Sequence, residues 1–472
     1  MHLWKKTALL TMITAGSLCL SFASAASTDE WGPGVQAEGD ITLPDGVNRQ
    51  MCSADYWLTG KGDDSRTLMS PEEIAELNRR CLETPETMMN RLEALPEQFD
   101  GTELKEKLAA FTSPKNLYLN GSPVEESYYE AIRSNIRGAA TSQQMPLRYG
   151  IAVNRTLMKA YPYGDLLSDS PTDPEWDNLA AAPVLVNEPL AVYFSTADGN
   201  FSYVRSMICS GWVPSADIAV CQDKSQWIEA QKMEHVLVVT GEKVWLEASS
   251  ADPEASEKML TMGTVLELCT DQEGMVANRM PWGNYVVWLP SRNPDGSYAR
   301  KQALIPANRD VHMGYLRLTT ENLLEQALKS LGNRYGWGGM LNSQDCSSYV
   351  RETYRCFGLE LPRNTSWQAA MPVKKTDMKD LSAEQKAAVL DTLAPGAILQ
   401  FPGHEMFYLG EKNGEYYVLS DISSVMGKID GQLERLRVRS VVLNSLDMKR
   451  ASGKTWMDDL TLAIIPWEMT EQ

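Results

Sequence analysis

The sequence predicts an α+β chain of several domains, with a helical N-terminal segment, two small β-barrels in tandem, and a C-terminal domain of mixed helices and strands. Two changes in hydrophobic periodicity support this prediction. Helical spacing is replaced near residue 146 by short alternating strands, and it returns near residue 313 before a last group of strands. At 472 residues, the chain is also too long for one ordinary core.

We expect six segments, separated where the periodicity or the composition changes. They are a signal peptide at 1–25, a linker at 26–45, a helical N-terminal domain at 46–145, a first β domain at 146–230, a second β domain at 231–312 and a C-terminal domain at 313–472. The linker is assigned from its content of Gly, Asp and Pro, which favours loops.

The first 25 residues have the pattern of a secretory signal peptide. Lys5 and Lys6 precede an apolar stretch, and Ala23 and Ala25 form an Ala-x-Ala cleavage site. We therefore expect cleavage and an extracytoplasmic product, either periplasmic, associated with the cell wall or secreted. Crossing a bilayer takes roughly 20 apolar residues in a row, and no later stretch has them, so no transmembrane segment is expected.

The chain is acidic, with 62 Asp and Glu against 44 Lys and Arg and a formal net charge of −18. Removal of the signal peptide takes away Lys5 and Lys6 and no acid, which leaves −18 − 2 = −20. Such a charge argues against nucleic acid or an anionic lipid surface as a partner.

Local signals support the helical and β segments. In SPEEIAELNRRCLE, Ser70 is the expected N-cap, Pro71 fits the first helical position and Glu73 completes a capping box. No catalytic pattern occurs in this helical part, so packing or docking is its expected role. In the first β domain, strands alternate around a turn at Asp198-Gly199-Asn200, and EHVLVVTGEKVWLE begins a second group of strands that suggests another small barrel.

The number of cysteines indicates a free thiol. Eight cysteines minus Cys19 of the signal peptide leave seven, and an odd number in an oxidising compartment leaves at least one unpaired within the chain. Cys52 with Cys81 and Cys209 with Cys221 are plausible local disulfides, although the sequence does not fix the connectivity.

Cys346 is the candidate nucleophile. It follows the glycine-rich stretch YGWGG and stands next to Asp345, a natural cap for the helix that begins there. A buried stripe at helical spacing is expected downstream, made of Val350, Thr353, Tyr354 and Phe357. At the positive end of the helix dipole the thiolate is favoured, so we expect a lowered pKa for Cys346. Cys356, near the other end of this helix, is expected to be structural.

His404 is the candidate general base for this thiol. It follows a Pro402-Gly403 turn at the predicted start of a strand, where its side chain would be accessible. His235 and His312 fall in or beside the second β domain and have no comparable setting. Three scattered histidines provide no ligand spacing for a metal, so we expect neither a metal nor another cofactor.

These motifs carry a resemblance to a known family. YGWGG, DCSS and PGHEMFYLG, with LPRNTSWQA between the last two, resemble the conserved segments of NlpC/P60 cysteine peptidases, which have a papain-like fold. The segment ending GWVPSADIA resembles the bacterial SH3-like modules that often precede such a domain. The catalytic resemblance covers about a third of the chain, and the helical N-terminal part has no sharp motif of its own.

The resemblance implies hydrolysis of peptidoglycan stem peptides or muropeptides, typically between γ-D-glutamate and a diamino acid. It assigns Cys346 as nucleophile and His404 as base. Asp345, Ser347 and Tyr335 match positions that contact substrate or lie beside the nucleophile. Two departures are present: Ser348 replaces the usual glycine after the Asp-Cys-Ser motif, and Ser420 stands where a third polar residue, commonly histidine, is expected.

The identity of the third catalytic residue stays open between Ser420 and Asp421. Asp421 would orient an imidazole better, but adjacent strand residues point to opposite faces. A two-residue turn at Asn413-Gly414 would place Asp421 on the face of His404, whereas a longer turn or a bulge would place Ser420 there.

We therefore predict a secreted peptidoglycan endopeptidase. A catalytically weak wall-binding protein that keeps the fold for recognition is the alternative from another class. An acyltransferase that uses the same Cys–His pair is a third and less favoured function.

Overall fold

A computed structural model describes residues 41–58, 64–429, 432–450 and 452–470 of the chain. The predicted signal peptide and almost all of the predicted linker lie outside the described residues. Residues 43–472 form one compact unit. Its helices are α1 (Ala54–Leu58), α2 (Pro71–Glu83), α3 (Gly101–Ala109), α4 (Glu126–Arg137), α5 (Lys224–Glu229), α6 (Thr320–Leu328), α7 (Cys346–Arg355), α8 (Thr365–Gln368), α9 (Ala383–Leu390) and α10 (Trp456–Asp459).

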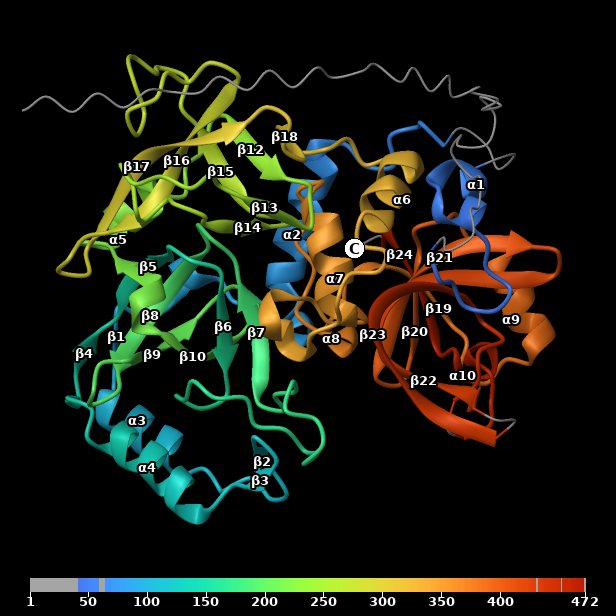
Figure 1. The fold of residues 1–472 in the computed structure, drawn as a ribbon, viewed down its shortest axis with the longest axis horizontal. Helices are drawn as coiled ribbons and strands as arrows, with labels where there is room; N and C mark the ends of the chain where they lie inside the picture. The colour runs from blue at the N-terminus through green and yellow to red at the C-terminus, as the bar shows by residue number, and fades with distance from the viewer. Residues whose placement is uncertain (1–40, 59–63, 430–431, 451, 471–472) are drawn as a thin grey trace, which may run out of the picture. The chain divides into compact units, whose positions relative to one another are not determined.

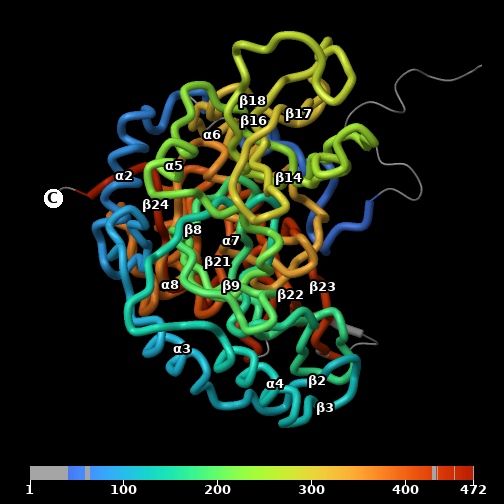
Figure 2. The backbone as a smooth tube through the Cα atoms, turned by 90° about the vertical axis from the view of Figure 1, so that its left-hand side faces the viewer, coloured from blue at the N-terminus to red at the C-terminus, as the bar shows by residue number. Residues whose placement is uncertain are grey.

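The N-terminal helices join two different cores. The predicted capping box at the start of α2 is confirmed, because Ser70 Oγ accepts from the Glu73 amide at 3.2 Å and the Glu73 carboxylate accepts from the Ser70 amide at 2.7 Å. Helices α1 and α2 bury Trp57 and Leu77 in the same core as helix α7. Helices α3 and α4 lie instead below a β-sheet formed by later residues, as two views at right angles show (Figures 1 and 2).

A seven-stranded antiparallel sheet follows, in the strand order β11-β5-β8-β9-β10-β6-β7. Its strands are β5 (Arg148–Ala152), β6 (Thr156–Lys159), β7 (Ala180–Val184), β8 (Pro189–Ser195), β9 (Phe201–Arg205), β10 (Ser210–Pro214) and β11 (Ile218–Val220). The predicted turn at residues 198–200 joins β8 to β9. Two small pairs accompany the sheet, β1 (Gln98–Phe99) with β4 (Met145–Pro146) and β2 (Tyr118–Leu119) with β3 (Ser122–Pro123).

The next sheet has five antiparallel strands in the order β17-β16-β15-β12-β18. They are β12 (Val236–Val239), β15 (Val265–Leu268), β16 (Asn284–Arg292), β17 (Tyr298–Pro306) and β18 (Val311–Met313), and a separate pair joins β13 (Lys243–Trp245) to β14 (Met259–Thr261). In the part of the chain that the structure describes, both large sheets have open strand orders. The predicted pair of closed SH3-like barrels is therefore not confirmed.

One edge of the seven-stranded sheet packs closely against the C-terminal part of the chain instead of closing on itself. Edge strand β7 lies against a short 3-10 helix, η5 (Trp337–Asn342). At the closest points of this contact, the residues of η5 are glycines. This contact brings the sheet to the segment that precedes Cys346.

The C-terminal part contains a six-stranded antiparallel sheet in the order β19-β24-β20-β21-β22-β23. Its strands are β19 (Val373–Asp377), β20 (Ile398–Phe401), β21 (His404–Lys412), β22 (Glu415–Ile429), β23 (Gln432–Ser445) and β24 (Leu462–Met469). Helix α7 packs on one face, where Phe407 contacts Tyr349 and Tyr354, and helices α9 and α10 cover the other face (Figure 1). A mixed α/β arrangement of several sheets is thus confirmed.

The helix that starts at Cys346 is buried on all sides. The predicted stripe is buried, and so are Arg351 and Glu352 on its other faces, with 1% and 0% of their surfaces exposed. Arg355, at the helix end, forms an ion pair with Glu188 from the loop before β8. This helix therefore sits between the six-stranded sheet and the two preceding sheets, which explains why a purely amphipathic pattern does not describe it.

The two suggested disulfides are not formed. Cys81, Cys209 and Cys221 are free thiols, which rules out both Cys52–Cys81 and Cys209–Cys221 in this structure. Cys356 is fully buried, and its sulfur contacts the Val239 carbonyl at 3.6 Å, in line with a structural role.

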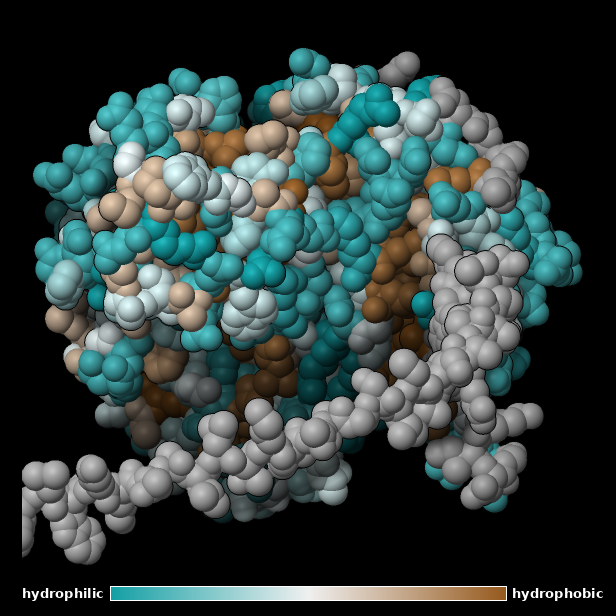
Figure 3. Space-filling view, turned by 45° about the horizontal axis from the view of Figure 1, so that its top comes forward, coloured by the Kyte–Doolittle hydropathy of each residue, from teal (hydrophilic) through white to brown (hydrophobic). Residues whose placement is uncertain are grey.

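The surface can be described by its hydropathy. The face in Figure 3 is mostly hydrophilic, and hydrophobic side chains show mainly in its hollows. Of the helices described, none has the length and apolar character needed to span a membrane.

Candidate active site

The glycine-rich turn before Cys346 depends on the absence of side chains. Gly338 and Gly339 have φ angles of 64° and 92°, in the left-handed region that favours glycine. A Cβ atom on Gly338 would lie 2.6 Å from the carbonyl oxygen of Ala180, and one on Gly339 would lie 2.9 Å from Pro183. The predicted tight turn is confirmed, and the missing side chains let strand β7 pack against the segment that precedes Cys346.

Asp345 caps helix α7, as predicted. Its Oδ1 accepts from the Ser348 amide at 2.9 Å, and the Ser348 hydroxyl accepts from the Asp345 amide at 2.8 Å, which completes a capping box. Its Oδ2 accepts from the Gly338 amide at 3.0 Å. Ser348 therefore has a specific role where the family pattern has glycine.

Arg363 binds Asp345 through two parallel hydrogen bonds, Nη2 to Oδ2 at 2.6 Å and Nη1 to Oδ1 at 3.2 Å. The same Nη1 donates to Ser347 Oγ at 3.0 Å. Burial disfavours the charge of Asp345, but Arg363 and the hydrogen bonds outweigh it, and the pKa of Asp345 is lowered. The Asp345 carboxylate is thus occupied by partners within the chain.

Arg363 received no role from sequence reasoning, although it stands in the LPRNTSWQA segment that carries part of the resemblance. Its only sequence signal is an arginine in that motif. Nothing in the spacing shows that it reaches back 18 residues to the helix cap.

Cys346 is the first residue of α7 and is 7% exposed. The backbone N–H of Glu405 donates a hydrogen bond to its sulfur. Burial raises the pKa of the Cys346 thiol well above its usual value, and the nearby Asp345 and Glu405 carboxyls add to the rise. The expected lowering of this pKa by the helix dipole is wrong, because desolvation and neighbouring acids outweigh the dipole.

His404 is the first residue of strand β21, as predicted. Its ring lies 5.1 Å from the ring of Phe401 and 5.4 Å from that of Trp456, measured between centroids. Its Nε2 is buried and has no hydrogen-bond partner among the described residues. Burial, with a smaller effect of the Arg450 charge, lowers the pKa of His404 to about 3. The imidazole is therefore neutral at neutral pH.

Cys346 and His404 line the same cavity of about 450 Å³, although they are 58 positions apart in the chain. Tyr335 lines it as well, so the fold brings three of the sequence-predicted residues together. Asp345 and Ser347 line a neighbouring cavity of about 590 Å³. Cys346 belongs to both cavities and therefore lies between them.

An aromatic wall of this cavity includes a residue from the seven-stranded sheet. Trp176, in the loop between β6 and β7, stacks on Tyr335 with a centroid distance of 6.0 Å and on Trp337 with one of 6.2 Å. The guanidinium of Arg439 lies over the Trp176 ring, 4.8 Å from its centroid. Sequence reasoning missed Trp176, because nothing in the loop marks it as part of a site formed mostly by the C-terminal residues.

The pairing of β21 with β22 determines which side chains share the face of His404. The turn at Asn413-Gly414 has two residues and pairs Glu411 with Tyr416, but a bulge between Tyr408 and Gly410 shifts the register by one. Beyond the bulge, Phe407 pairs with Leu419.

Continuing this register, Ser420 lies opposite Met406, on the face of His404, and Asp421 lies opposite Glu405 on the other face. The Ser420 hydroxyl donates to Asn444 Oδ1 at 3.3 Å. The chain thus realises the second of the two arrangements left open by the sequence.

Asp421 and Glu405 place two acids on the face of the sheet that packs against α7, close to Cys346. Both are fully buried, and neither oxygen of Asp421 has a hydrogen-bond partner among the described residues. Burial, reinforced by the charge of Asp345, raises the pKa of Asp421 well above its usual value. Burial also raises the pKa of Glu405 to about 8, despite a hydrogen bond of 2.8 Å from Gln400 Nε2. Both acids are neutral at moderately acidic pH.

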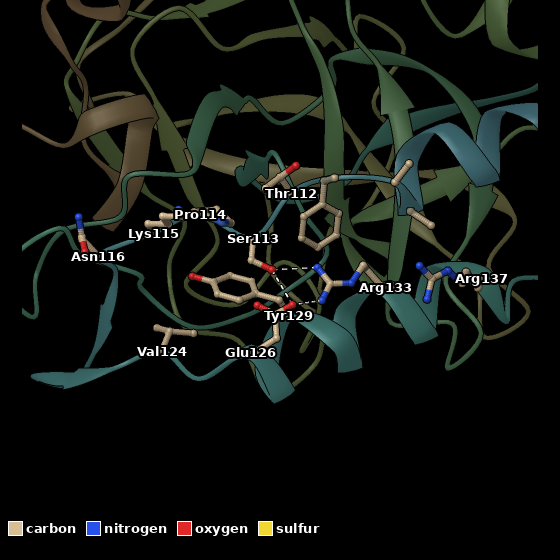
Figure 4. A pocket seen from close by; sticks show the side chains of 13 residues that line it. Thr112, Ser113, Pro114, Lys115, Asn116, Val124, Glu126, Tyr129, Arg133 and Arg137 are labelled. Carbon is tan, nitrogen blue, oxygen red and sulfur yellow. Dashed lines mark hydrogen bonds and ion pairs between the residues drawn. The ribbon is translucent and has the colours of Figure 1, made fainter.

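A larger cavity of about 700 Å³ lies elsewhere, between helix α4 and the residues after α3 (Figure 4). There Arg133 bonds Ser113 at 2.9 Å and also contacts the Glu126 carboxylate. Among the described residues, no cysteine or histidine lines this cavity. It therefore lacks the candidate nucleophile and the candidate base that line the first cavity. Within the described residues, no group of three or more His, Cys, Asp or Glu side chains is arranged to hold a metal ion.

Comparisons with known proteins point to the same region. The sequence model of the NlpC/P60 family matches residues 332–417. The fold is similar to that of an NlpC/P60 endopeptidase from Photobacterium damselae subsp. piscicida, with a TM-score of 0.71 and 17% identity over 92% of this chain and 100% of the other. A search among curated proteins found no match.

A second solved structure, an NlpC/P60 family protein from Bacillus cereus ATCC 10987, has a TM-score of 0.43 and 15% identity over 67% of this chain and 98% of the other. The matched segment contains the glycine-rich turn, Cys346 and His404, and the similarity to the Photobacterium protein extends the likeness in fold over most of the chain. The C-terminal part of this chain therefore carries a domain of the NlpC/P60 family.

Proposed function

We propose that this chain is an extracytoplasmic cysteine peptidase that cuts peptidoglycan stem peptides between γ-D-glutamate and a diamino acid. The observation that carries the proposal is the meeting of Cys346 and His404 in one cavity, within a segment that matches a peptidase family. Thiol and imidazole are the pair that cysteine peptidases use for nucleophilic attack and proton transfer.

The pKa shifts support a mechanism that starts from a neutral pair. Burial raises the pKa of Cys346 and lowers that of His404, so neither group carries charge before substrate binds. The imidazole accepts the thiol proton as sulfur attacks the substrate carbonyl. The same proton then passes to the leaving amine when the C–N bond breaks. Water, activated by the imidazole, hydrolyses the thioester that remains on Cys346.

The helix start supplies the stabilisation that this attack requires. The first N–H groups of a helix have no partner within the helix, and Cys346 is the first residue of α7. Its amide is therefore in place to donate to the oxyanion of the tetrahedral intermediate. Asp345 acts as a positioning residue in this scheme, because its carboxylate is held by Arg363, whereas Ser347 and Tyr335 are placed to contact substrate.

Ser420 is the third residue in this proposal, because it shares the face of His404. It supports the imidazole indirectly through the strand it occupies and its bond to Asn444. We keep the predicted domains as part of the proposal: a helical domain at 46–145, two β domains at 146–230 and 231–312, and the catalytic domain at 313–472. The two β domains are proposed to be SH3-like modules. Trp176 supports a role for the first of them in narrowing the cleft.

Digestion of purified muropeptides, followed by mass spectrometry, tests the function. Wild type should release γ-D-glutamyl fragments, and Cys346→Ala should release none. Cys356→Ala is the matched control, because Cys356 lies at the other end of the same helix and outside the cavity. Cleavage by Cys346→Ala would exclude Cys346 as nucleophile. Retained wall binding without cleavage by wild type would favour a wall-binding protein.

A further inference from the structure

The cavity that holds Cys346 and His404 has a charge opposite to that of the whole protein. The chain carries a formal net charge of −18, yet among the described residues the charged side chains that line this cavity are those of Arg435, Lys449 and Arg450, with no Asp or Glu. An acidic protein that gathers cations at its proposed catalytic cleft is suited to an anionic ligand.

Two of these cations, Arg435 and Lys449, lie on one face of the long β22–β23 hairpin and of the segment that follows it. Met426 pairs with Arg435 on one side and forms a bridge to Lys449 on the other. Residues directly opposite each other in antiparallel strands share a face, with Cα atoms about 5 Å apart. Arg435 and Lys449 therefore flank Met426 at roughly 10 Å from each other, and all three line the cavity.

The neighbouring cations form ion pairs with acids, and among the described residues these two do not. Arg437 and Arg439, further along β23, both contact Asp173, the first at 3.6 Å. Arg450 pairs with Asp459 at 3.3 Å.

Arg435, by contrast, uses its Nε to bond the neutral Ser424 hydroxyl at 2.8 Å. Among the side chains that the structure describes, no acid forms an ion pair with Arg435 or with Lys449. Neither cation is therefore held by an ion pair with a described residue, although Lys449 helps to lower the pKa of Asp458. Arg435 also lines a cavity that contains Asp173.

We propose that Arg435 and Lys449 form a subsite that binds carboxylates of the stem peptide beside the bond to be cut. This inference rests on the proposed function and names the form of substrate that it takes. In a γ-linked glutamyl bond the α-carboxylate of glutamate remains free, and the diamino acid carries a carboxylate of its own. A guanidinium pairs with a carboxylate through two parallel hydrogen bonds, and an ammonium acts as a point charge.

The subsite discriminates by charge. A stem peptide with free carboxylates offers a counter-charge to both cations, whereas an amidated peptide leaves at least one of them without a carboxylate partner. Wild type therefore favours the free acid over the amide by about tenfold or more in KM, since a hydrogen bond to a charged group is worth at least that factor. The turnover number changes little, because neither side chain takes part in proton transfer.

Two muropeptides that differ only in amidation of these carboxylates provide the test. We expect the double variant Arg435→Gln/Lys449→Gln to raise KM for the free acid about tenfold or more, with little change for the amide. Arg309→Gln/Lys379→Gln is the matched control, because it removes the same two charges from exposed residues outside the cavity. It should keep the preference of wild type.

Binding to Cys346→Ala, measured by calorimetry for both peptides, separates this inference from the proposed function. A preference for the free acid that disappears when Arg435→Gln/Lys449→Gln is added supports the subsite, whether or not wild type cleaves. Equal affinity for the two peptides, or a preference that survives the double variant, overturns the subsite and leaves the cleavage result to judge the peptidase.

Discussion

The two sides of Cys346 hold buried acids in opposite ways. On the helix side, Asp345 is charged and bound by Arg363 through two hydrogen bonds. On the sheet side, Glu405 and Asp421 have no basic partner among the described residues, and burial raises the pKa of both. A carboxyl group that loses water either gains a counter-charge or keeps its proton. The Cys346 thiol lies between the ion-paired carboxylate of Asp345 and the two carboxyls whose protonated forms are favoured.

This difference assigns different tasks to the two sides. The Asp345–Arg363 ion pair connects the helix cap to a loop 18 residues away and holds the N-terminus of α7 in place. The raised pKa of about 8 keeps Glu405 neutral below that pH, and burial likewise favours the protonated form of Asp421. Above that pH, an ionised Glu405 opposes formation of the thiolate.

Removal of Arg363 is expected to have the largest effect, because it converts the helix side into a buried charge without a partner. Arg363→Met should lower the free energy of unfolding by about 3–5 kcal/mol, the usual loss when one member of a buried ion pair is removed. Chemical denaturation measures this change. The double variant Asp345→Asn/Arg363→Met should recover part of the loss, since no uncompensated carboxylate remains.

Arg79→Met is the control for this experiment. Arg79 also binds two carboxylates, those of Glu76 and Glu83, but it is about half exposed. Water replaces the lost partners there, so we expect little change in stability. If Arg363→Met proved no more destabilising than Arg79→Met, the Asp345–Arg363 pair would not hold the N-terminus of α7 in place.

A smaller effect, dependent on pH, is expected on the sheet side. The pKa of Glu405 is about 8 in the folded protein and near 4.5 without burial, so the folded state keeps a proton that the unfolded state loses. The protonated Glu405 therefore contributes fully to the free energy of unfolding of wild type below pH 4.5, and this contribution is lost as the pH rises to 8. The loss is at most about 5 kcal/mol, from the difference between these two pKa values.

Glu405→Gln removes the titrating proton and keeps a similar shape. Its stability relative to wild type should rise between pH 5 and pH 8, as measured by denaturation midpoints in the same buffers. The backbone bond from residue 405 to Cys346 is not affected by this change. A stability difference that is the same at both pH values would show that Glu405 does not titrate in this range.

The same contrast explains which parts of the site can be predicted from sequence. The helix cap at Asp345, the candidate nucleophile Cys346 and the strand start at His404 follow from local signals, namely glycines, a capping residue and a turn before a strand. Arg363 and Trp176 depend on contacts between segments far apart in the chain, for which a single sequence has no local signal. The fold classes follow from periodicity, whereas closure of a sheet depends on edge contacts such as those of β7.

The pKa of Cys346 and the register of β22 show a further limit. The helix dipole can be predicted from the sequence, but the burial that outweighs it arises only when Glu405 and Asp421 are brought beneath the thiol. The bulge after Tyr408 adds one residue to a strand whose turn has two residues, one of the two lengths that the sequence left open. Neither property can be read from the local pattern.

The smallest effect is expected from the residues that compete for the third catalytic position, and it depends on the face that each one occupies. Ser420→Ala should lower the turnover number only a few-fold, because the hydroxyl bonds Asn444 and supports the His404 face indirectly. Asp421→Asn should change it less, because Asp421 lies on the opposite face and its burial, which raises its pKa, favours a neutral group such as an amide. Turnover of one muropeptide by both variants, measured at pH 6, decides between them. A larger loss in Asp421→Asn would mean that the sheet-side acid acts on the imidazole, and the separation of the two faces would then be wrong.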